Sequence, residues 1–527
     1  MIPTILYRRA SLVAAVVLTA GCAARSVPAV NPPRAPGAAA PRVAVGAMPT
    51  CTGAKTPAGR LCVELDRLFA APALDTAVWS VLVQSLDTGE VVYHLNPSTL
   101  VVPASNMKVV SMAVGATRLG WDYRYETRLE TAGSVVDGVL LGDLVVVGSG
   151  DPSINGRDGD RDAVFVEWAG ALRAAGITRI DGRIVGDGRA FEGERYGDGW
   201  AWDNFAFGYQ APVGALQYNE NLVEVVVEPG AAPGEPARVE LQPATSDLRV
   251  VNRVETSPSG SDGDVDIWRF PGRTDLEVSG TVPVGSKPVV RSAAVDNPTL
   301  YFARALKAAL VASGIVVNGE AVDGGTDEIL DVAGEGAHET PRRVLVTHAS
   351  PPLSEIGKTL MKVSQNLYAE TVLRTISLQP GPASVDASKK LLEETLGQWG
   401  IAPRQYFVAD GSGLSRHNYV SAQMIVAILR QMARDPASLA AFEATLPIAG
   451  TDGTIAGRMK ATRAAGNARA KTGTLRSVRA LSGYVRSIDG ERFVFSMIAN
   501  NFQAPTSAVD IVVDQAVAQL ASFTRKR

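Results

Sequence analysis

The stretch Pro103-Ala104-Ser105-Asn106-Met107-Lys108 opens a run with few helix breakers, which continues to Leu119 and ends at Gly120. Its apolar positions predict a buried helix over 105–119. Residues three apart share a helix face, so the Lys108 amine can reach the Ser105 hydroxyl. A lysine whose pKa is lowered by burial or by a nearby cation can take the proton of a serine nucleophile. The stretch therefore predicts a Ser-Lys nucleophile, and the alternative is a capping Ser beside a solvated Lys.

A second motif, Lys471-Thr472-Gly473-Thr474, is the only K-T-G in the chain. It precedes two apolar runs, 479–486 and 492–499, that predict an antiparallel hairpin. We therefore expect the motif on a strand near the edge of a sheet. Gly473 would let a substrate or a neighbouring chain approach closely, while Lys471, Thr472 and Thr474 can hold a carboxylate.

A third motif is Ser364-Gln365-Asn366, within an apolar pattern over 356–367 that predicts a second buried helix. Polar groups beside a core face usually form hydrogen bonds, and the simplest alternative is that these are satisfied locally. The stretch Ser153-Ile154-Asn155 fits the same S-x-N pattern. We favour Ser364 because it lies on a predicted helix, whereas Ser153 follows Asp151-Pro152.

The order S-x-x-K, S-x-N and K-T-G is the signature of the serine penicillin-recognising enzymes, and the chain resembles that superfamily. The long interval from Ser105 to Ser364 resembles the class C low-molecular-mass penicillin-binding proteins, which are D-alanyl-D-alanine carboxypeptidase/endopeptidases. Gln365 stands where Asp is common in that family. The resemblance runs from about residue 75 to the C-terminus and includes Gly150-Asp151-Pro152, Tyr218-Asn219-Glu220-Asn221, Ser279-Gly280-Thr281-Val282-Pro283, Asp410-Gly411-Ser412-Gly413-Leu414-Ser415-Arg416 and Leu446-Pro447-Ile448-Ala449-Gly450.

The resemblance implies an α/β fold. Its core would be a β-lactamase/transpeptidase-like domain, an antiparallel sheet flanked by helices, with a large β-rich insertion. Short Val-rich strands separated by Gly, Asp and Pro dominate from about residue 123 to 285. We therefore expect the catalytic penicillin-binding domain in 61–125 and 340–527, and an inserted β-rich region of two subdomains in 126–339.

The resemblance also implies acyl transfer on D-Ala-D-Ala ends of peptidoglycan stem peptides or on D-Ala cross-links, with no metal or cofactor and with covalent binding of penicillin. Ser105 would attack with Lys108 as base, Ser364 would relay the proton to the leaving amine, and Asn366 would orient Lys108 and the substrate amide. Lys471, Thr472, Gly473 and Thr474 would hold the terminal carboxylate, and the backbone N–H groups of Ser105 and Thr474 would form the oxyanion hole.

Two further residues, Asp151 and Arg416, match by motif position residues that contact the side chain of the stem peptide. One acid and one Arg would suit the amine and the carboxylate of that side chain. The alternatives are an Asp-Pro turn for Asp151 and a solvated loop residue for Arg416.

The first 22 residues are typical of a signal peptide, with Arg8 and Arg9 before an apolar stretch at 11–20. Leu18-Thr19-Ala20-Gly21-Cys22 resembles a bacterial lipobox, which predicts lipidation of Cys22; simple cleavage with loss of Cys22 is the alternative. Residues 23–60 read as an Ala/Pro-rich spacer. We expect an exported protein of the periplasm or cell envelope, anchored to a membrane through lipid if Cys22 is modified. There Cys51 and Cys62 could form a disulfide or remain two thiols.

Composition limits the functions open to the chain. Its 527 residues exceed one domain, and 51 Lys and Arg against 54 Asp and Glu leave a net charge of −3, with no global field for nucleic acid. Four His and three Cys are poor material for a metal site. Two other functions compete: a secreted β-lactamase or esterase, which needs rapid deacylation, and a noncatalytic wall-binding lipoprotein, which would not react with penicillin.

Overall fold

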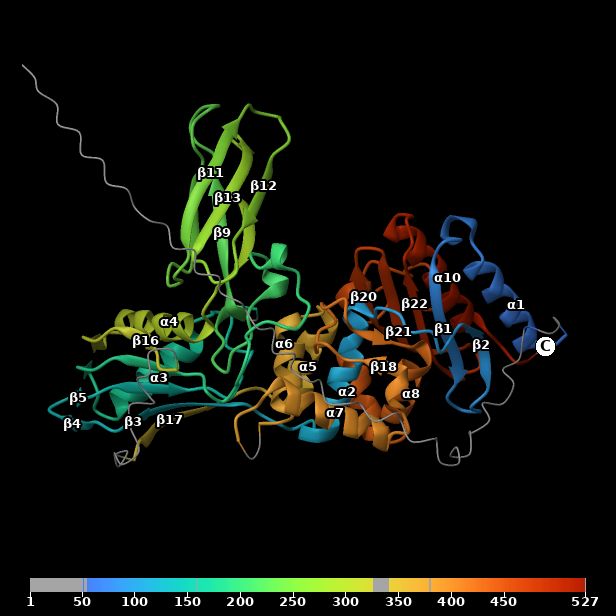
Figure 1. Ribbon diagram of the computed structural model, residues 1–527, viewed down its shortest axis with the longest axis horizontal. Helices are drawn as coiled ribbons and strands as arrows, with labels where there is room; N and C mark the ends of the chain where they lie inside the picture. Colours follow the sequence, from blue (N-terminus) through green and yellow to red (C-terminus); the bar gives the residue numbers. More distant parts are fainter. Residues whose placement is uncertain (1–50, 52–54, 158, 326–340, 379–380, 527) are drawn as a thin grey trace, which may run out of the picture. The chain divides into compact units, whose positions relative to one another are not determined.

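The central sheet is built from both ends of the chain. The computed structural model describes residue 51 and residues 55–157, 159–325, 341–378 and 381–526. Five antiparallel strands lie in the order β2-β1-β22-β21-β20. The predicted hairpin forms β21 (Val478–Arg486) and β22 (Arg492–Asn500), and β1 (Val78–Ser85), β2 (Val91–Leu95) and β20 (Arg469–Leu475) complete the sheet (Figure 1). The K-T-G motif therefore lies on an edge strand, as expected.

Helices cover both faces of this sheet. On one face α1 (Pro57–Phe69) and α10 (Thr506–Ser522) share a core with the sheet. On the other face lies α2 (Met107–Leu119), buried from Met107 to Ala116, and around it pack α5 (Leu353–Lys362), α6 (Asn366–Thr375), α7 (Val385–Gln398), α8 (Ala422–Met432) and α9 (Pro436–Thr445). A short pair, β18 (Tyr406–Phe407) and β19 (Tyr419–Val420), lies between α7 and α8 in the sequence. The predicted antiparallel sheet flanked by helices is confirmed.

Between α2 and α5 the chain builds further sheets. The first has the order β16-β8-β6-β3-β17 and packs with α3 (Ala163–Ala174) and α4 (Pro298–Ala312). Strands β6, β8 and β16 are parallel, whereas β3 and β17 pair antiparallel. The strands of this sheet are β3 (Glu126–Thr131), β6 (Leu144–Val147), β8 (Ile184–Asp187), β16 (Ala321–Asp323) and β17 (Arg343–Ala349). A small neighbouring sheet contains β4 (Ser134–Val136), β5 (Val139–Leu141), β7 (Arg179–Ile180) and β15 (Val316–Val317).

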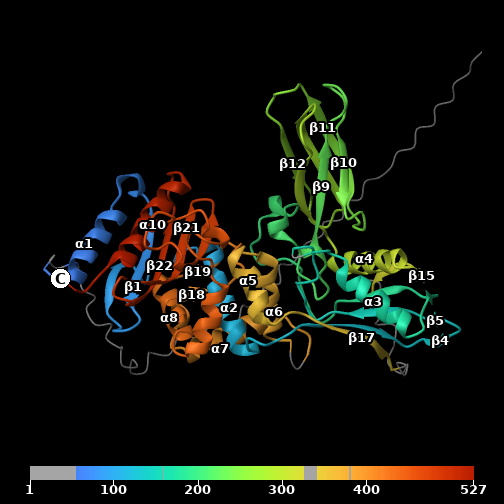
Figure 2. The same cartoon turned by 180° about the vertical axis from the view of Figure 1, so that it is seen from behind.

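The middle of the insertion is almost entirely β-structure. One three-stranded sheet has the order β10-β9-β14 and another the order β11-β13-β12. Figure 2 shows β9, β10, β11 and β12 side by side. The apolar residues of these strands join the core that also contains α3 and α4. The strands are β9 (Leu222–Glu228), β10 (Arg238–Gln242), β11 (Arg249–Ser257), β12 (Asp264–Trp268), β13 (Asp275–Pro283) and β14 (Val289–Ala294).

Two expected boundaries shift. β17 lies beyond residue 339, the expected end of the insertion, yet from Arg343 to Ala349 it pairs with β3 and so extends the sheet of the insertion. Helix α1 begins within the expected spacer 23–60: Thr56 caps it by accepting from the Gly59 N–H at 3.0 Å, and Pro57 occupies its first turn. The expected signal peptide, Cys22 and the spacer up to residue 50 lie outside the described residues.

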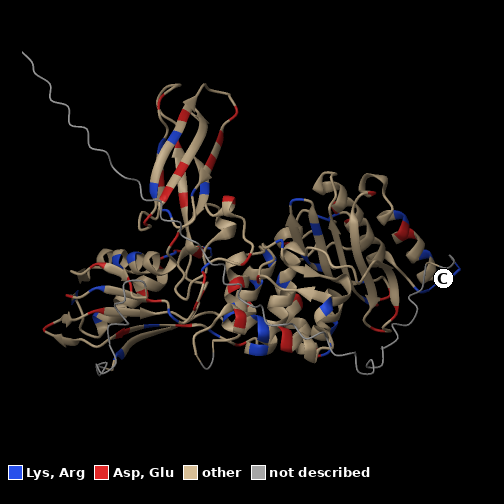
Figure 3. Ribbon diagram, in the orientation of Figure 1, with Lys and Arg blue, Asp and Glu red and all other residues tan. Residues whose placement is uncertain are grey.

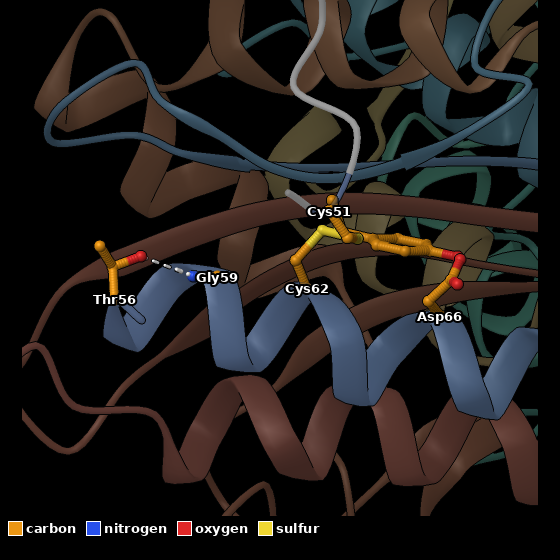
Figure 4. Close-up of a disulfide and its surroundings, with 6 residues drawn as sticks. Cys51, Thr56, Gly59, Cys62 and Asp66 are labelled. Carbon is orange, nitrogen blue, oxygen red and sulfur yellow. Dashed lines mark hydrogen bonds between the residues drawn. A yellow bond between two sulfur atoms is a disulfide. The ribbon is translucent and has the colours of Figure 1, made fainter. Parts of the chain in front are cut away.

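The start of α1 is held by a disulfide. Cys51 and Cys62 are bonded, with Cα atoms 5.6 Å apart, which confirms the paired alternative (Figure 4). On the same helix Asp66 accepts a hydrogen bond from the Tyr93 hydroxyl at 3.3 Å, which ties α1 to β2. Figure 3 shows basic and acidic residues interspersed over the helices and strands, in keeping with the small net charge. Within the described ranges, no helix has the length and apolar character needed to span a membrane.

Candidate active site

The S-x-x-K motif lies where a short helical turn, Ala104–Asn106, leads into α2. Ala104 has a φ of 47°, a left-handed conformation that turns the chain into the helix. Lys108 is fully buried, and its Nζ donates to the Ser105 Oγ at 3.0 Å. The sequence expectation that Lys108 reaches Ser105 is therefore confirmed.

The Lys108 amine has two more acceptors. Its Nζ lies 2.6 Å from the Asn366 Oδ1 and 2.8 Å from the Ser412 carbonyl oxygen. Burial lowers the pKa of Lys108 to about 7, although the nearby carboxyls of Asp410 and Glu370 act in the opposite direction. At neutral pH a large fraction of the amine is therefore unprotonated and able to accept a proton from Ser105.

Ser364 does not lie on a helix, contrary to the sequence prediction. Helix α5 ends at Lys362 and α6 begins at Asn366, and Ser364 between them has a left-handed φ of 62°. Val363, expected on a buried face, is 48% exposed. This break in the helix brings the Ser364 Oγ within 2.9 Å of the Lys471 Nζ, which donates to it. In a continuous helix the Ser364 side chain would point in a different direction. The break between α5 and α6 therefore allows its contact with Lys471.

The K-T-G strand lies directly against the loop that carries Ser105. A Cβ on Gly473 would lie 2.5 Å from the Pro103 carbonyl oxygen and 3.1 Å from the Asn106 nitrogen, so a residue with a side chain cannot fit without displacing backbone. The Asn106 side-chain amide donates to the Lys471 carbonyl at 3.0 Å, which adds a second tie between the two segments. Gly473 is thus needed for close packing of β20 on the nucleophile loop.

Cations gather at the same edge. Lys471 is fully buried, and its pKa is lowered by burial first and then by Lys108 and Arg479. Arg479 donates to the Thr474 hydroxyl and pairs with both carboxylate oxygens of Asp510 at 2.7 Å. The Thr472 hydroxyl bonds the Thr454 hydroxyl at 2.8 Å. Oriented hydroxyls backed by cations can receive a carboxylate here.

The motifs meet at one cavity of about 720 Å³. Arg416 lines it as expected, and its guanidinium donates to the Arg476 carbonyl at 2.8 Å. The inserted region contributes to the wall, because the Asn366 side-chain amide donates to the Tyr209 carbonyl at 2.7 Å. The lining residues include Ser105, Ala201, Asn204, Tyr209, Ser364, Asn366, Gly413, Arg416, His417, Thr454, Thr472 and Thr474.

Asp151 lies outside the wall of this cavity, so its expected contact with the stem peptide stays a prediction. It is 2% exposed and is not among the residues that line the cavity. Its Oδ1 accepts from the Ser153 N–H at 2.8 Å and the Ser153 hydroxyl at 2.6 Å, and its Oδ2 lies 3.6 Å from the His348 Nε2. Asp151 therefore stabilises its own turn, and Ser153, the other S-x-N candidate, is engaged there rather than at the site.

Three residues that sequence reasoning missed hold the loop after Ala409. Glu370, four positions after Asn366 on α6, accepts the N–H groups of Gly411 at 3.0 Å and Ser412 at 2.8 Å. Asp410 accepts the N–H groups of Gly413 at 2.7 Å and Ser415 at 2.6 Å. Asp410 also accepts from the Trp200 indole N–H at 2.9 Å. The available signals were the helical spacing from Asn366 to Glu370 and the family-like stretch that begins at Asp410.

The two carboxyls are close enough to interact. Burial raises the pKa of Glu370 to about 7, and the charge of Asp410 adds to that rise, although the N–H groups of Gly411 and Ser412 oppose it. Asp410 has four N–H donors, since the Asn418 side-chain amide also donates to it at 2.7 Å. Asp410 therefore accepts more hydrogen bonds from N–H groups than Glu370 does.

The chain is similar to known proteins both in sequence and in fold. The D-Ala-D-Ala carboxypeptidase 3 (S13) family matches residues 61–522. The chain is 33% identical to a D-alanyl-D-alanine carboxypeptidase of Actinomadura sp. (strain R39), over 87% of this chain and 84% of that protein. It is 28% identical to the D-alanyl-D-alanine carboxypeptidase DacB of Haemophilus influenzae, over 80% of this chain and 85% of the relative. The crystal structure of penicillin binding protein 4 (dacB) from Haemophilus influenzae superposes with a TM-score of 0.75 at 25% identity, covering 87% of this chain and 99% of the other.

Proposed function

Because the chain belongs to the D-Ala-D-Ala carboxypeptidase 3 (S13) family, it is a serine D-Ala-D-Ala carboxypeptidase, and we propose that Ser105 forms its acyl-enzyme. The observation that carries this assignment is the contact of 3.0 Å between the Lys108 Nζ and the Ser105 Oγ, inside the cavity where the three motifs meet. The substrate is the D-Ala-D-Ala end of a peptidoglycan stem peptide, and β-lactams react at the same serine.

Acylation follows from the placement of the side chains. The Ser105 Oγ attacks the carbonyl carbon of the penultimate D-Ala and gives its proton to the Lys108 Nζ, while the backbone N–H groups of Ser105 and Thr474 bind the oxyanion. The C–N bond then breaks, and Ser364 gives its proton to the nitrogen of the leaving D-Ala while it takes back the proton that Lys108 accepted, so that Lys108 is again a free amine. Lys471, Thr472 and Thr474 hold the carboxylate of that residue.

Water completes the cycle. It attacks the ester carbonyl of the acyl-enzyme and gives a proton to Lys108. The bond between the acyl carbon and the Ser105 Oγ then breaks, and Lys108 returns the proton to the Ser105 Oγ as the shortened peptide leaves. With penicillin the bond that opens is the ring amide, and the leaving nitrogen stays attached to the acyl group. The adduct therefore keeps the full mass of penicillin on Ser105.

The direct test is Ser105→Ala with a fluorescent penicillin. We expect complete loss of covalent labelling, whereas Ser261→Ala, at an exposed turn of the inserted sheets, should label like the wild type. Mass spectrometry of digested wild type should place the adduct on the peptide that contains Ser105. Covalent labelling of the Ser105→Ala variant would overturn the assignment.

The relative rates of carboxypeptidase and endopeptidase cleavage need a separate experiment. Carboxypeptidase action removes the terminal D-Ala, and we propose that the same acyl-enzyme also forms from D-Ala cross-links, since both reactions break a D-Ala amide. Incubation with purified cross-linked muropeptides should yield monomers with the masses expected of endopeptidase cleavage. Loss of D-Ala from pentapeptide ends without any monomer release would restrict the function to carboxypeptidase.

We also propose export to the periplasm or cell envelope, with residues 1–22 as the signal peptide and Cys22 as a lipid anchor. The Cys51–Cys62 disulfide supports an oxidising compartment. Labelled palmitate should enter the wild type and not Cys22→Ala. Absence of label from the wild type, with a mature N-terminus beyond Cys22, would favour simple cleavage.

A further inference from the structure

Large aromatic side chains are exposed next to the cavity. Trp202 is 60% exposed, Phe270 is 52% exposed and Tyr209 is 46% exposed. Tyr209 lines the cavity, and Trp202 lies in the sequence between the lining residues Ala201 and Asn204. Soluble proteins rarely leave large apolar groups gathered in contact with water unless the surface binds something. These three residues are called the aromatic surface below.

The rings of Trp202 and Phe270 form an exposed platform of nearly parallel planes. The ring centroids of Trp202 and Phe270 lie 6.4 Å apart and the two planes are within 14° of parallel. Trp268 packs edge-on against Phe270, with the centroids 4.1 Å apart and the planes at 75°. Trp268 therefore supports Phe270, half of whose side chain stays exposed.

Buried contacts fix this platform in place. Arg269, whose side chain is fully buried, pairs with Asp296 at 2.7 Å and donates to the Phe205 carbonyl at 3.1 Å. This links the turn that carries Phe270 to the segment that follows Trp202. The Gln210 side-chain amide donates to the Ala201 carbonyl at 2.8 Å, which holds the neighbours of Trp202 and Tyr209 together. Preformed rings lose little conformational entropy when a ligand binds.

We propose that the aromatic surface binds sugar rings of the glycan strand from which the stem peptide extends. The inference rests on the proposed function, because a stem peptide acylating Ser105 must lead back out of the cavity to its sugar. The four residues between the scissile carbonyl and the sugar span at most about 13 to 14 Å, so the sugar must lie near the cavity mouth. Tyr209 lines the cavity, and Trp202 follows the lining residue Ala201 in the sequence.

The shape of the surface selects a sugar over an apolar peptide. A pyranose ring presents a flat face of C–H groups while its hydroxyl and acetamido groups stay in water, which matches exposed, nearly parallel rings. An apolar side chain or a drug-like molecule is instead expected in a concave site that surrounds it. The aromatic surface is exposed and two of its rings are nearly parallel, so one face of a saccharide is the ligand that it fits.

The test compares two substrates that differ in the sugar alone: a D-Ala-D-Ala pentapeptide, and the same pentapeptide on its N-acetylated disaccharide. For Trp202→Ala and Phe270→Ala we expect kcat/KM on the disaccharide substrate to fall about tenfold, mainly through KM. On the free pentapeptide it should stay within twofold of wild type. Phe407→Ala, which removes an equally exposed ring from β18, should change neither value.

The outcomes separate this inference from the proposed function. Equal losses on both substrates, or no loss on either, would overturn the glycan assignment while leaving the peptidase intact. Failure of the wild type to cleave either substrate would instead contradict the proposed function. A second measurement uses the penicillin-acylated enzyme and a peptide-free disaccharide: titration should quench tryptophan fluorescence in the wild type and not in Trp202→Ala, and no saturable quenching in the wild type would count against the proposal.

Discussion

The Ser412 carbonyl oxygen lies 2.8 Å from the Lys108 Nζ and accepts its third hydrogen bond, although Ser412 belongs to none of the three motifs. The N–H of the same residue donates to Glu370 at 2.8 Å, so the peptide group is held from behind by a buried carboxyl. None of the three oxygens that contact the Lys108 amine carries a charge of its own. This lets the amine be neutral without losing its position, as a general base requires.

The pH dependence of acylation should report the Lys108 amine. Its pKa is lowered to about 7, so the free amine predominates above that pH and the protonated form below it. We expect the second-order rate of penicillin acylation to rise with pH with a midpoint near 7, and to fall about tenfold per unit well below it. Stopped-flow measurements from pH 5 to 9 would show this, with tryptophan fluorescence as a check that the fold persists. A flat profile to pH 5 would contradict the role of Lys108 as base, and a midpoint near 10 would contradict the lowering of its pKa by burial.

Glu370→Gln should shift the midpoint of that pH profile to a lower pH. The carboxyls near Lys108 raise its pKa, so removing one lowers it and moves the midpoint below 7. The maximal rate should also fall about tenfold, because a charge-assisted bond to Ser412 is worth about 1.5 to 3 kcal/mol. Glu355→Gln, at an exposed position on α5, is the matched control and should leave both quantities unchanged. A lower rate with an unmoved midpoint would indicate a purely structural role for Glu370.

The sequence predicted the parts of this site that depend on local spacing. Ser105 and Lys108 are three apart, and that spacing places them together on any helix, while K-T-G before a hairpin places Lys471 on a strand. Ser364 was misplaced because the apolar period continues through Val363 and Leu367, and the period does not reveal a single residue with a left-handed φ. The strand β17 likewise pairs with β3 over a long sequence distance that no local pattern records.

Residues that act through tertiary contacts were beyond sequence reasoning. No sequence motif links Glu370 with Trp200. Glu370 on α6 and Trp200 in the inserted region both form hydrogen bonds with the loop that begins at Asp410. For Asp151 a motif position predicts substrate contact, whereas the local contacts that the structure shows are those of its own turn. Distances between segments far apart in sequence, rather than residue type, decide such roles.

Gly473→Ala should separate the K-T-G strand from the nucleophile loop. The new Cβ would meet the Pro103 carbonyl oxygen at 2.5 Å, and both groups are backbone, so β20 or the loop must move. We expect penicillin acylation to fall by more than 100-fold. Gly397→Ala on α7 is the control: its Cβ meets nothing within 4 Å, and a helical Gly→Ala change stabilises by about 1 kcal/mol. Wild-type acylation in Gly473→Ala would show that the close approach is dispensable.

Trp200→Phe should measure the bond to the buried Asp410. It removes the N–H that lies 2.9 Å from the Asp410 Oδ2 while keeping an aromatic ring. We expect a loss of about 1.5 to 3 kcal/mol in the free energy of unfolding and a severalfold slower acylation.

The matched control for that variant is Trp168→Phe. Trp168 is a buried tryptophan whose indole nitrogen has no hydrogen-bond partner among the described residues, so its change loses ring volume alone. Urea unfolding of both variants isolates the bond as the difference between them. Equal destabilisation would mean that the Asp410 carboxylate gains nothing from Trp200.

The disulfide should stabilise the fold without serving the chemistry. Cys51 and Cys62 are 11 positions apart, and closing a loop of that size in the unfolded chain stabilises the folded state by about 3 kcal/mol. Helix α1 packs with β2 and α10 on one face of the central sheet, whereas α2 and Ser105 belong to the other face. The double variant Cys51→Ala and Cys62→Ala should therefore lose about 3 kcal/mol in urea unfolding yet label with penicillin at the wild-type rate at 25 °C.

Reducing agent should destabilise the wild type by the same amount and leave the double variant unaffected. If reduction slowed acylation under conditions where the protein remains folded, the two faces of the sheet would have to be coupled, and the separation argued from the two cores would fail.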